Sequence, residues 1–482
     1  MAHSTRVSAV WLLVGFGLMQ VAWMAALPPF RGADEVDHVF RASAVAHGEW
    51  VSEPTDATIG TGAVVSVSTA IVEAARPACE RLGYKAADDC GPPAPDTDRV
   101  DVPTASGRYN PTYYALVGYP STVLDGTAAV VLMRVISAGM CLALLAFGLV
   151  RLAAWGGPRR LLAVGIGAAP TVVYSATVVA PNGLEMMAAL GFWIALAGLA
   201  HDHEPRRENG HVVLGVVAGA LLVTLRSMGP FWALAILSVS LLAWPGLFPR
   251  LRNLVRKPQG KVAVAVGLVA GVASLTWILV QRSLVVGLEP EGGTVSITFR
   301  FLRTLQELPV WVLQAIAAFP FRNQPAPLVV YPCYLIVVGC LLVVGLRSAD
   351  RRLRLAVLAT VAMSLTVPLV ITFATIDVFG TAWQGRYGLP LLLGAAVLAG
   401  DGWERAARRP PSMGVLGLGI ALLLVVHTAG VASVAATMGQ EDAWTTGVGE
   451  LPHAPAWAAL ALALTGAVAA FVPAAAQVRR PG

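Results

Sequence analysis

The chain has 482 residues, of which 56% are hydrophobic and only 13% are charged, and its formal net charge at pH 7 is +6. An ordinary soluble domain carries about 25% charged residues, so this composition excludes a soluble globule, a disordered chain and a secreted disulfide scaffold. The positive charge does not indicate nucleic-acid binding, because most basic residues fall in short loops between apolar stretches of bilayer-spanning length. The sequence therefore predicts an all-α polytopic membrane protein.

Apolar stretches of about 20 residues, the length that spans a bilayer, divide the chain into predicted segments. A first transmembrane helix lies within 1–27, helices two to seven within 127–281, and helices eight to twelve within 327–482, with two larger polar segments at 28–126 and 282–326. The spans, about twelve in all, are expected near 8–27, 127–150, 161–180, 185–201, 211–226, 230–248, 262–281, 327–346, 355–376, 387–400, 413–436 and 455–474.

Basic residues gather in the connections that follow every second span. If the N-terminus is inside, these connections are cytoplasmic and hold most of the arginines, as the positive-inside rule requires. Both termini are then expected in the cytoplasm, with 28–126 as an external lobe and 282–326 as an external loop. The first segment fits a retained anchor better than a cleaved signal peptide, because it is long enough to span the membrane.

The most polar motif of the chain, PPFRGADEVDHVFRA, follows the first span at 28–42. If a juxtamembrane helix starts near Asp34, then Asp34, Asp37, His38 and Arg41 share one of its faces. That face could turn carboxylates and a histidine toward a cavity at the membrane surface. Alternatively, Asp34 is an N-cap and its acidic neighbours complement the helix dipole. The two roles are compatible.

A cluster of tyrosines ends the external lobe just before the second span. The segment RYNPTYYALVGYP at 108–120 contains Tyr109, Tyr113, Tyr114 and Tyr119. Tyrosine at this depth ordinarily belongs to the interfacial aromatic belt. These rings could equally stack on a sugar or pack the lobe, and the sequence leaves the three interpretations open. Earlier in the lobe, 64–72 is expected to form a short strand or helix.

Four ionisable residues fall in or beside predicted spans: Arg134, Glu185, Arg226 and Arg386. Each such residue costs about 2.5 to 3.5 kcal/mol on insertion scales, which makes it a functional candidate. A single one could simply extend its charge to the interface. All four map to the outer half of their spans, however, and this shared depth favours a common site.

The segment TAWQGRYGLP at 381–390 places Gln384 and Tyr387 beside Arg386 at the outer mouth of the tenth span. Arginine presents a planar fork that binds phosphate through two parallel hydrogen bonds. The alternative is an interfacial anchor.

Cysteine and metal-ligand patterns are sparse. Cys79 and Cys90 both lie in the external lobe, where an oxidising compartment permits a disulfide bond between them. The sequence contains no HExxH, paired CxxC, GxxxxGK[ST] or GxSxG motif. No metal site or cofactor is therefore expected, although the sequence leaves open whether a divalent metal assists.

The three segments 28–42, 108–120 and 381–390, in this order and at these topological places, resemble motifs of the GT-C superfamily of membrane glycosyltransferases. They are most similar to the bacterial membrane-protein family catalogued as domain of unknown function 2142. The matching residues are Pro28, Pro29, Asp34, Glu35, His38, Arg41 and Ala42 after the first span, Pro111, Tyr113 and Tyr114 before the second, and Gly385, Arg386, Tyr387 and Pro390 late in the chain. One departure is Asn182, which stands where the family pattern has an aspartate.

The resemblance implies transfer of a sugar from a polyprenyl-phosphate donor to a cell-envelope glycan, lipid or protein at the external face of the bacterial cytoplasmic membrane. The residues favour the same chemistry, since an acceptor hydroxyl needs a base and an anionic leaving group needs a cation. Asp34 is the expected base, with Glu35 as a second catalytic carboxylate. Donor phosphate contacts are expected from Arg386, Arg134, Arg226 and His38, and substrate contacts from Asp37, Arg41, Tyr109, Tyr113, Tyr114, Glu185, Gln384 and Tyr387.

A transporter or flippase of lipid-linked saccharides is the main alternative function, because it would also need many spans and membrane-depth cations. Such proteins place functional charge at the bilayer midplane and often contain two similar halves. The sequence shows no internal repeat, and its large lobe after the first span suits an outward-facing enzyme better. A catalytically inactive scaffold of a cell-envelope complex is a third interpretation.

Overall fold

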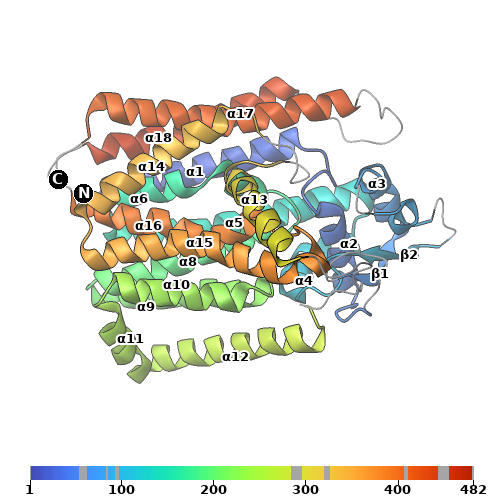
Figure 1. Ribbon diagram of the computed structural model, residues 1–482, viewed down its shortest axis with the longest axis horizontal. Helices are drawn as coiled ribbons and strands as arrows, with labels where there is room; N and C mark the ends of the chain where they lie inside the picture. Colours follow the sequence, from blue (N-terminus) through green and yellow to red (C-terminus); the bar gives the residue numbers. More distant parts are fainter. Residues whose placement is uncertain are drawn as a thin grey trace.

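The computed structural model describes residues 2–53, 62–82, 85–92, 97–283, 296–319, 326–406, 411–442 and 455–479. Its long helices run side by side in one bundle, and a smaller lobe covers one end (Figure 1). Nine helices in the described parts are long and apolar enough to cross a membrane. They are α1 (Ala2–Ala26), α5 (Gly126–Trp155), α8 (Pro181–His201), α9 (Pro205–Leu225), α12 (Pro258–Val280), α14 (Val330–Ser348), α15 (Arg351–Phe379), α17 (Met413–Asp442) and α18 (Ala456–Val478).

Three of the predicted spans form shorter helices. The segment 161–180 breaks into α6 (Gly157–Gly167) and α7 (Pro170–Ser175), because the residue before a proline is pushed out of helical geometry and Ala169 is accordingly extended. The other two are α10 (Gly229–Ala243) and α16 (Leu389–Arg405). The all-α polytopic architecture is confirmed, whereas the count of about twelve spans stays a prediction.

Two further helices lie within segments that the sequence interpretation had treated as loops. The first, α11 (Leu247–Arg256), precedes α12. The second, α13 (Ile297–Ile316), crosses the bundle obliquely (Figure 1) and leaves apolar side chains such as Phe299 and Phe301 more than half exposed. An amphipathic helix of this kind suits the membrane interface, where one face meets lipid and the other packs on protein. The C-terminal end of α13 contacts the short helix η3 (Gly385–Gly388).

The lobe combines short helices with one small sheet. Strands β1 (Ala63–Ser68) and β2 (Arg99–Thr104) pair antiparallel, with Ala63 opposite Thr104 and Ser68 opposite Arg99. The segment 64–72, expected as a strand or a helix, contains most of strand β1 and the start of helix α3. The lobe elements are α2 (Glu35–Ala46), β1 (Ala63–Ser68), α3 (Thr69–Cys79), η1 (Ala87–Cys90), β2 (Arg99–Thr104), α4 (Pro111–Val117) and η2 (Tyr119–Thr122).

Cys79 at the end of α3 is joined to Cys90 at the end of η1 by a disulfide bond, with the two Cα atoms 5.7 Å apart. The bond closes a short loop, which restricts the unfolded chain and stabilises such a loop by about 3 kcal/mol. We therefore expect Cys79→Ser together with Cys90→Ser to lower the thermal unfolding temperature of the purified protein. Cys340→Ser, at an exposed free thiol, is the control. Mass spectrometry of a non-reduced digest that found both lobe cysteines as free thiols would contradict the bond.

Candidate functional site

The turn between α1 and α2 brings Asp34 to the junction of bundle and lobe. Both Phe30 (φ 67°) and Asp34 (φ 59°) have left-handed backbone conformations, which are uncommon for residues other than glycine. Asp34 stands at the N-cap position of α2, yet its side chain makes no capping hydrogen bond. Its Oδ2 instead accepts a hydrogen bond from Nη2 of Arg386, forming an ion pair. The carboxylate therefore contacts Arg386 and does not cap the helix.

Arg386 is positioned by the docking of η3 against α13. The backbone N–H of Gly385 donates to Oε1 of Gln314 (2.8 Å), and Nε1 of Trp311 donates to the carbonyl of Trp383 (3.2 Å). A Cβ at position 385 would overlap the carbonyl of Trp311, so only glycine allows this close approach. These contacts explain the glycine before Arg386. They also hold the Arg386 side chain in place, of which only 8% is exposed.

A second guanidinium lies beside the first. Arg226, directly after α9, pairs with Glu185 in the first turns of α8 at 3.5 Å. Its Cζ lies 4.2 Å from the ring centroid of Tyr387 and 5.9 Å from that of Tyr109. The Cζ of Arg386 lies 5.5 Å from the centroid of the same Tyr387 ring, so both cations make cation–π contacts with Tyr387.

Four sequence-predicted residues from four distant segments therefore converge: Asp34, Glu185, Arg226 and Arg386. Glu185 reaches the cluster although Asn182 replaces the aspartate of the family pattern. A Cβ at Gly183 would overlap the carbonyl of Ser175, so this glycine lets the start of α8 pack directly on α7.

Glu35 and Arg134 form a separate, deeper ion pair. Nε and Nη2 of Arg134 donate to the two carboxylate oxygens of Glu35 at 2.7 and 2.5 Å. The Glu35 carboxylate also accepts from the backbone N–H groups of Gly32 and Val179, both at 3.0 Å. Burial raises the pKa of Glu35, but the charge of Arg134 and these N–H bonds outweigh burial and hold the pKa below its usual value.

Arg134 uses two of its remaining N–H groups on the backbone of the α1–α2 turn. Nη1 donates to the carbonyl of Leu27 (2.6 Å) and Nη2 to that of Pro28 (2.7 Å). All three nitrogens of the Arg134 guanidinium therefore have partners in Glu35 and this turn. Together with Glu35, Arg134 fixes the turn that presents Asp34.

His38 lies one turn after Asp34 on α2. Its Nδ1 is 2.8 Å from the Tyr114 hydroxyl and 2.9 Å from the Ser106 hydroxyl. Burial lowers the pKa of His38 to about 4, so the ring is neutral near pH 7. A neutral imidazole offers a phosphate or a sugar hydroxyl one hydrogen bond and no positive charge.

The other predicted residues of α2 are bonded within the lobe. Asp37 pairs with Lys85 (3.0 Å) and accepts from the N–H of Ala105 (2.9 Å). Arg41 is fully buried and donates to the carbonyls of Glu49 and Tyr109 (3.2 and 3.1 Å), among others.

Two of the predicted tyrosines are core residues. Tyr113 and Tyr114 are 1% and 0% exposed, and the Tyr113 hydroxyl lies 2.9 Å from Ser137 of α5. Their packing joins the lobe to the bundle and leaves no ring face open to a sugar. Tyr109 and Tyr387, by contrast, are half-buried and flank Arg226.

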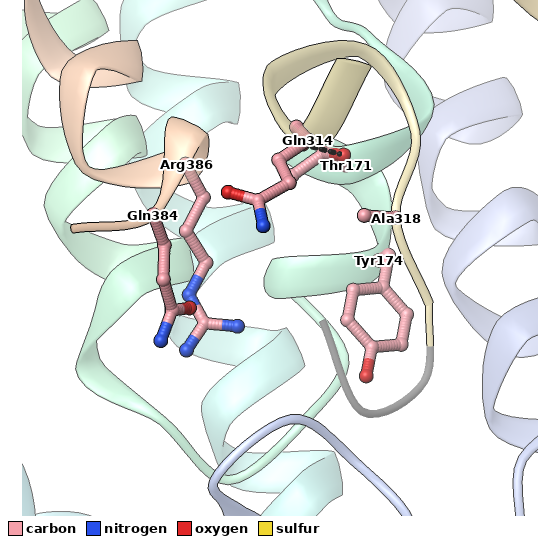
Figure 2. Close-up of a pocket in the computed structure, with 6 residues that line it drawn as sticks. All are labelled: Thr171, Tyr174, Gln314, Ala318, Gln384 and Arg386. Atoms are coloured by element: carbon pink, nitrogen blue, oxygen red, sulfur yellow. Dashed lines mark hydrogen bonds between the residues drawn. The ribbon is translucent and has the colours of Figure 1, made fainter. Parts of the chain in front are cut away.

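Figure 2 shows a small polar pocket beside Arg386, in which the side chains of Gln384 and Arg386 extend in parallel. Thr171, Tyr174, Gln314 and Ala318 complete the lining, and the Thr171 hydroxyl donates to the Gln314 carbonyl (2.9 Å). Sequence reasoning missed Thr171, Tyr174 and Gln314. The helix-breaking Pro170 and the amphipathic pattern of 297–316 were the available signals.

A much larger apolar cavity of about 270 Å³ adjoins this region between α13, α14, α15 and α16. The segment 383–386, which leads into η3, separates the two spaces, since Trp383 and Gly385 line the apolar cavity while Gln384 and Arg386 line the polar pocket. A polar and an apolar space thus lie on opposite sides of this segment. Within the described residues, no three His, Cys, Asp or Glu side chains are grouped so as to hold a metal ion.

Fold and site together define a polytopic membrane protein with a charged cluster at the junction of its bundle and lobe. The family described as predicted membrane protein (DUF2142) matches residues 16–395, and the chain belongs to this family. No curated protein sequence matches the chain. Two crystal structures of ArnT from Cupriavidus metallidurans are similar, one in the apo state (TM-score 0.48, 15% identity) and one bound to undecaprenyl phosphate (0.47, 14%), each covering 97% of this chain and 76% of the ArnT chain.

Proposed function

We propose that the protein transfers a sugar from a polyprenyl-phosphate donor to a cell-envelope acceptor. The observation that carries this proposal is the meeting of a partly accessible carboxylate, Asp34, with a buried guanidinium, Arg386, at the border of an apolar cavity. A lipid-linked donor needs an apolar surface for its chain and a cation for its phosphate. An acceptor hydroxyl needs a base beside them.

The division made by segment 383–386 supports a lipid-linked donor in particular. The donor phosphate would lie at Arg386 and the first part of its chain in the cavity lined by Trp311, Trp383 and Leu389. A free nucleotide sugar has no apolar chain to fill this cavity. The cavity lining is almost wholly apolar, which suits an isoprenoid chain.

In the proposed reaction, Asp34 accepts the proton of the acceptor hydroxyl as its oxygen bonds to the anomeric carbon. The bond between that carbon and the phosphate oxygen breaks, and negative charge grows on the departing polyprenyl phosphate. A fixed guanidinium in a site shielded from water stabilises this growing charge more than it stabilises the donor. Arg386 has this position, and Arg226 adds a second cation across the Tyr387 ring.

The other residues divide by their contacts. Tyr109, Tyr387 and Gln384 border the cluster and are proposed substrate contacts, while Glu185 orients Arg226. The neutral His38 is proposed to offer a hydrogen bond. The buried bonds of Asp37, Arg41, Tyr113 and Tyr114 within the lobe favour a supporting role for these four in place of the predicted direct contact.

The position of the charges also bears on the transporter alternative. Arg386 lies between α15 and α16, Arg226 directly follows α9, and Glu185 lies near the start of α8. All three therefore lie at helix ends next to the lobe, and not at mid-bundle as expected for a transporter site. We propose that this end faces outside and that both termini are cytoplasmic, which agrees with the charge pattern and with a disulfide in the lobe.

The test is a transfer assay with the purified protein in proteoliposomes. Polyprenyl-phosphate monosaccharides carrying a labelled sugar are supplied together with an envelope extract as acceptor. The proposal expects label in the acceptor fraction and an equal amount of free polyprenyl phosphate. Movement of intact donor across the vesicle wall without either product would overturn the proposal in favour of a flippase.

A further inference from the structure

The ion pair at Arg386 uses only part of one edge of the guanidinium. Nη2 contacts Asp34, whereas Nε is buried and has no hydrogen-bond partner among the described residues. Nε and Nη2 together form the side edge of the planar fork, which holds a phosphate by two parallel N–H bonds. Asp34 therefore contacts one of the two nitrogens of the edge that a phosphate would need.

The polar pocket that Arg386 lines is too small for a phosphate in the present arrangement. The polar pocket lined by Gln384 and Arg386 has a volume of about 10 Å³, roughly the room for one water molecule. Some group must therefore move when an anion binds. Arg386 is held by the docking of η3 on α13, and its side chain is 8% exposed. The Asp34 side chain is 24% exposed, and Asp34 is the last residue of the turn between α1 and α2. It is therefore the partner more able to move out of the ion pair.

We propose that Asp34 is the resting counter-ion of Arg386, that the phosphate of the lipid donor displaces it, and that this exchange frees the base only when donor is bound. The inference rests on the proposed function and adds a binding order to it. One anion replaces another, so the buried guanidinium is paired before and after the exchange, and neither end state leaves it as an unpaired buried charge. The carboxylate released by the exchange remains beside the phosphate, where the acceptor hydroxyl must arrive.

This arrangement has a consequence for affinity that does not depend on catalysis. When a binding-competent form is only a fraction of the population, the apparent dissociation constant rises by the inverse of that fraction. In the wild-type protein the competent form is the one with the Asp34–Arg386 contact open. Removing the carboxylate should make every molecule competent, so the protein should bind a lipid phosphate more tightly once its proposed catalytic base is gone.

The experiment measures binding of farnesyl phosphate to the full-length protein in detergent by isothermal titration calorimetry. The expected result is about tenfold tighter binding by Asp34→Asn than by wild type, and weak or absent binding by Arg386→Gln. Asp350→Asn is the matched control, because it removes a carboxylate from another arginine pair, with Arg405 (2.7 Å). Its affinity should equal that of wild type. Farnesol, which lacks the phosphate, should not distinguish wild type from Asp34→Asn.

The possible results distinguish a failure of the counter-ion exchange from a failure of the proposed function. Equal or weaker binding of farnesyl phosphate by Asp34→Asn, with clear binding by wild type, would overturn the counter-ion exchange and leave the proposed transfer intact. Absence of binding by both wild type and Asp34→Asn would remove the support for a lipid-phosphate donor itself. A gain shared by Asp350→Asn would assign the effect to net charge and also overturn the inference.

Discussion

Asp34→Asn should abolish most of the sugar transfer although the protein stays folded and still binds the donor. A sugar hydroxyl is a poor nucleophile at neutral pH, and a carboxylate that accepts its proton is typically worth about 10² to 10⁴-fold in rate. Asparagine keeps the size of the side chain and removes the proton acceptor. The measurement is transfer from a polyprenyl-phosphate sugar by purified variants, after size-exclusion chromatography has shown each to be monodisperse.

The control for this experiment is Asp101→Asn, the same substitution at an exposed position of β2 in the same lobe. It should transfer sugar at the wild-type rate. If Asp34→Asn also did so, Asp34 would not be the base, and the role would pass to another carboxylate of the cluster. Arg386→Lys completes the set. It keeps the charge but loses the planar fork, and we expect it to lower the rate by about 10²-fold.

An ionisable side chain at membrane depth is costly, so its presence in the sequence already indicates a function. The cost of insertion and the shared side of the membrane predict a common site for Arg134, Glu185, Arg226 and Arg386. In the structure the last three lie together with Asp34, whereas Arg134 pairs with Glu35. The family was also identified from short motifs and is confirmed over residues 16–395. What a single sequence shows poorly is which charge pairs with which.

The Glu35–Arg134 pair illustrates this limit. Its members are 99 positions apart, and nothing in their local patterns predicts that they meet. By depth and sign alone, Arg134 was as good a phosphate ligand as Arg386. The tyrosines of 108–120 were ambiguous for the same reason, because the choice between a belt, a sugar platform and a core depends on what lies opposite. The structure places Ser137 of α5 opposite Tyr113.

The break in 161–180 shows a different limit. Apolar length predicted one span there, but Pro170 divides it into α6 and α7. That break brings Thr171 and Tyr174 to the pocket beside Arg386, where the Tyr174 hydroxyl also accepts from the N–H of Ala33 (2.8 Å). A local signal was present, but its consequence depended on the position of η3, more than 200 residues later in the sequence.

Glu35→Met should destabilise the protein strongly, in contrast to Asp34→Asn. The substitution leaves Arg134 as an unpaired buried charge, and breaking one partner of a buried ion pair typically costs about 3 to 5 kcal/mol. Arg134→Met should cost a similar amount, since it leaves the Glu35 carboxylate buried and unpaired. The measurement is thermal unfolding of each purified variant in the same detergent.

The double variant, Glu35→Met with Arg134→Met, tests whether the effect comes from the unpaired charge. Replacing both partners of a buried pair by apolar residues is often tolerated, so the double variant should lose less stability than the two single losses added together. Some loss should remain, because the N–H groups of Gly32 and Val179 would then lack their acceptor. Strict additivity would show that Glu35 and Arg134 act independently. A stable Glu35→Met variant that had lost transfer would indicate that Glu35, and not only Asp34, takes part directly in the chemistry.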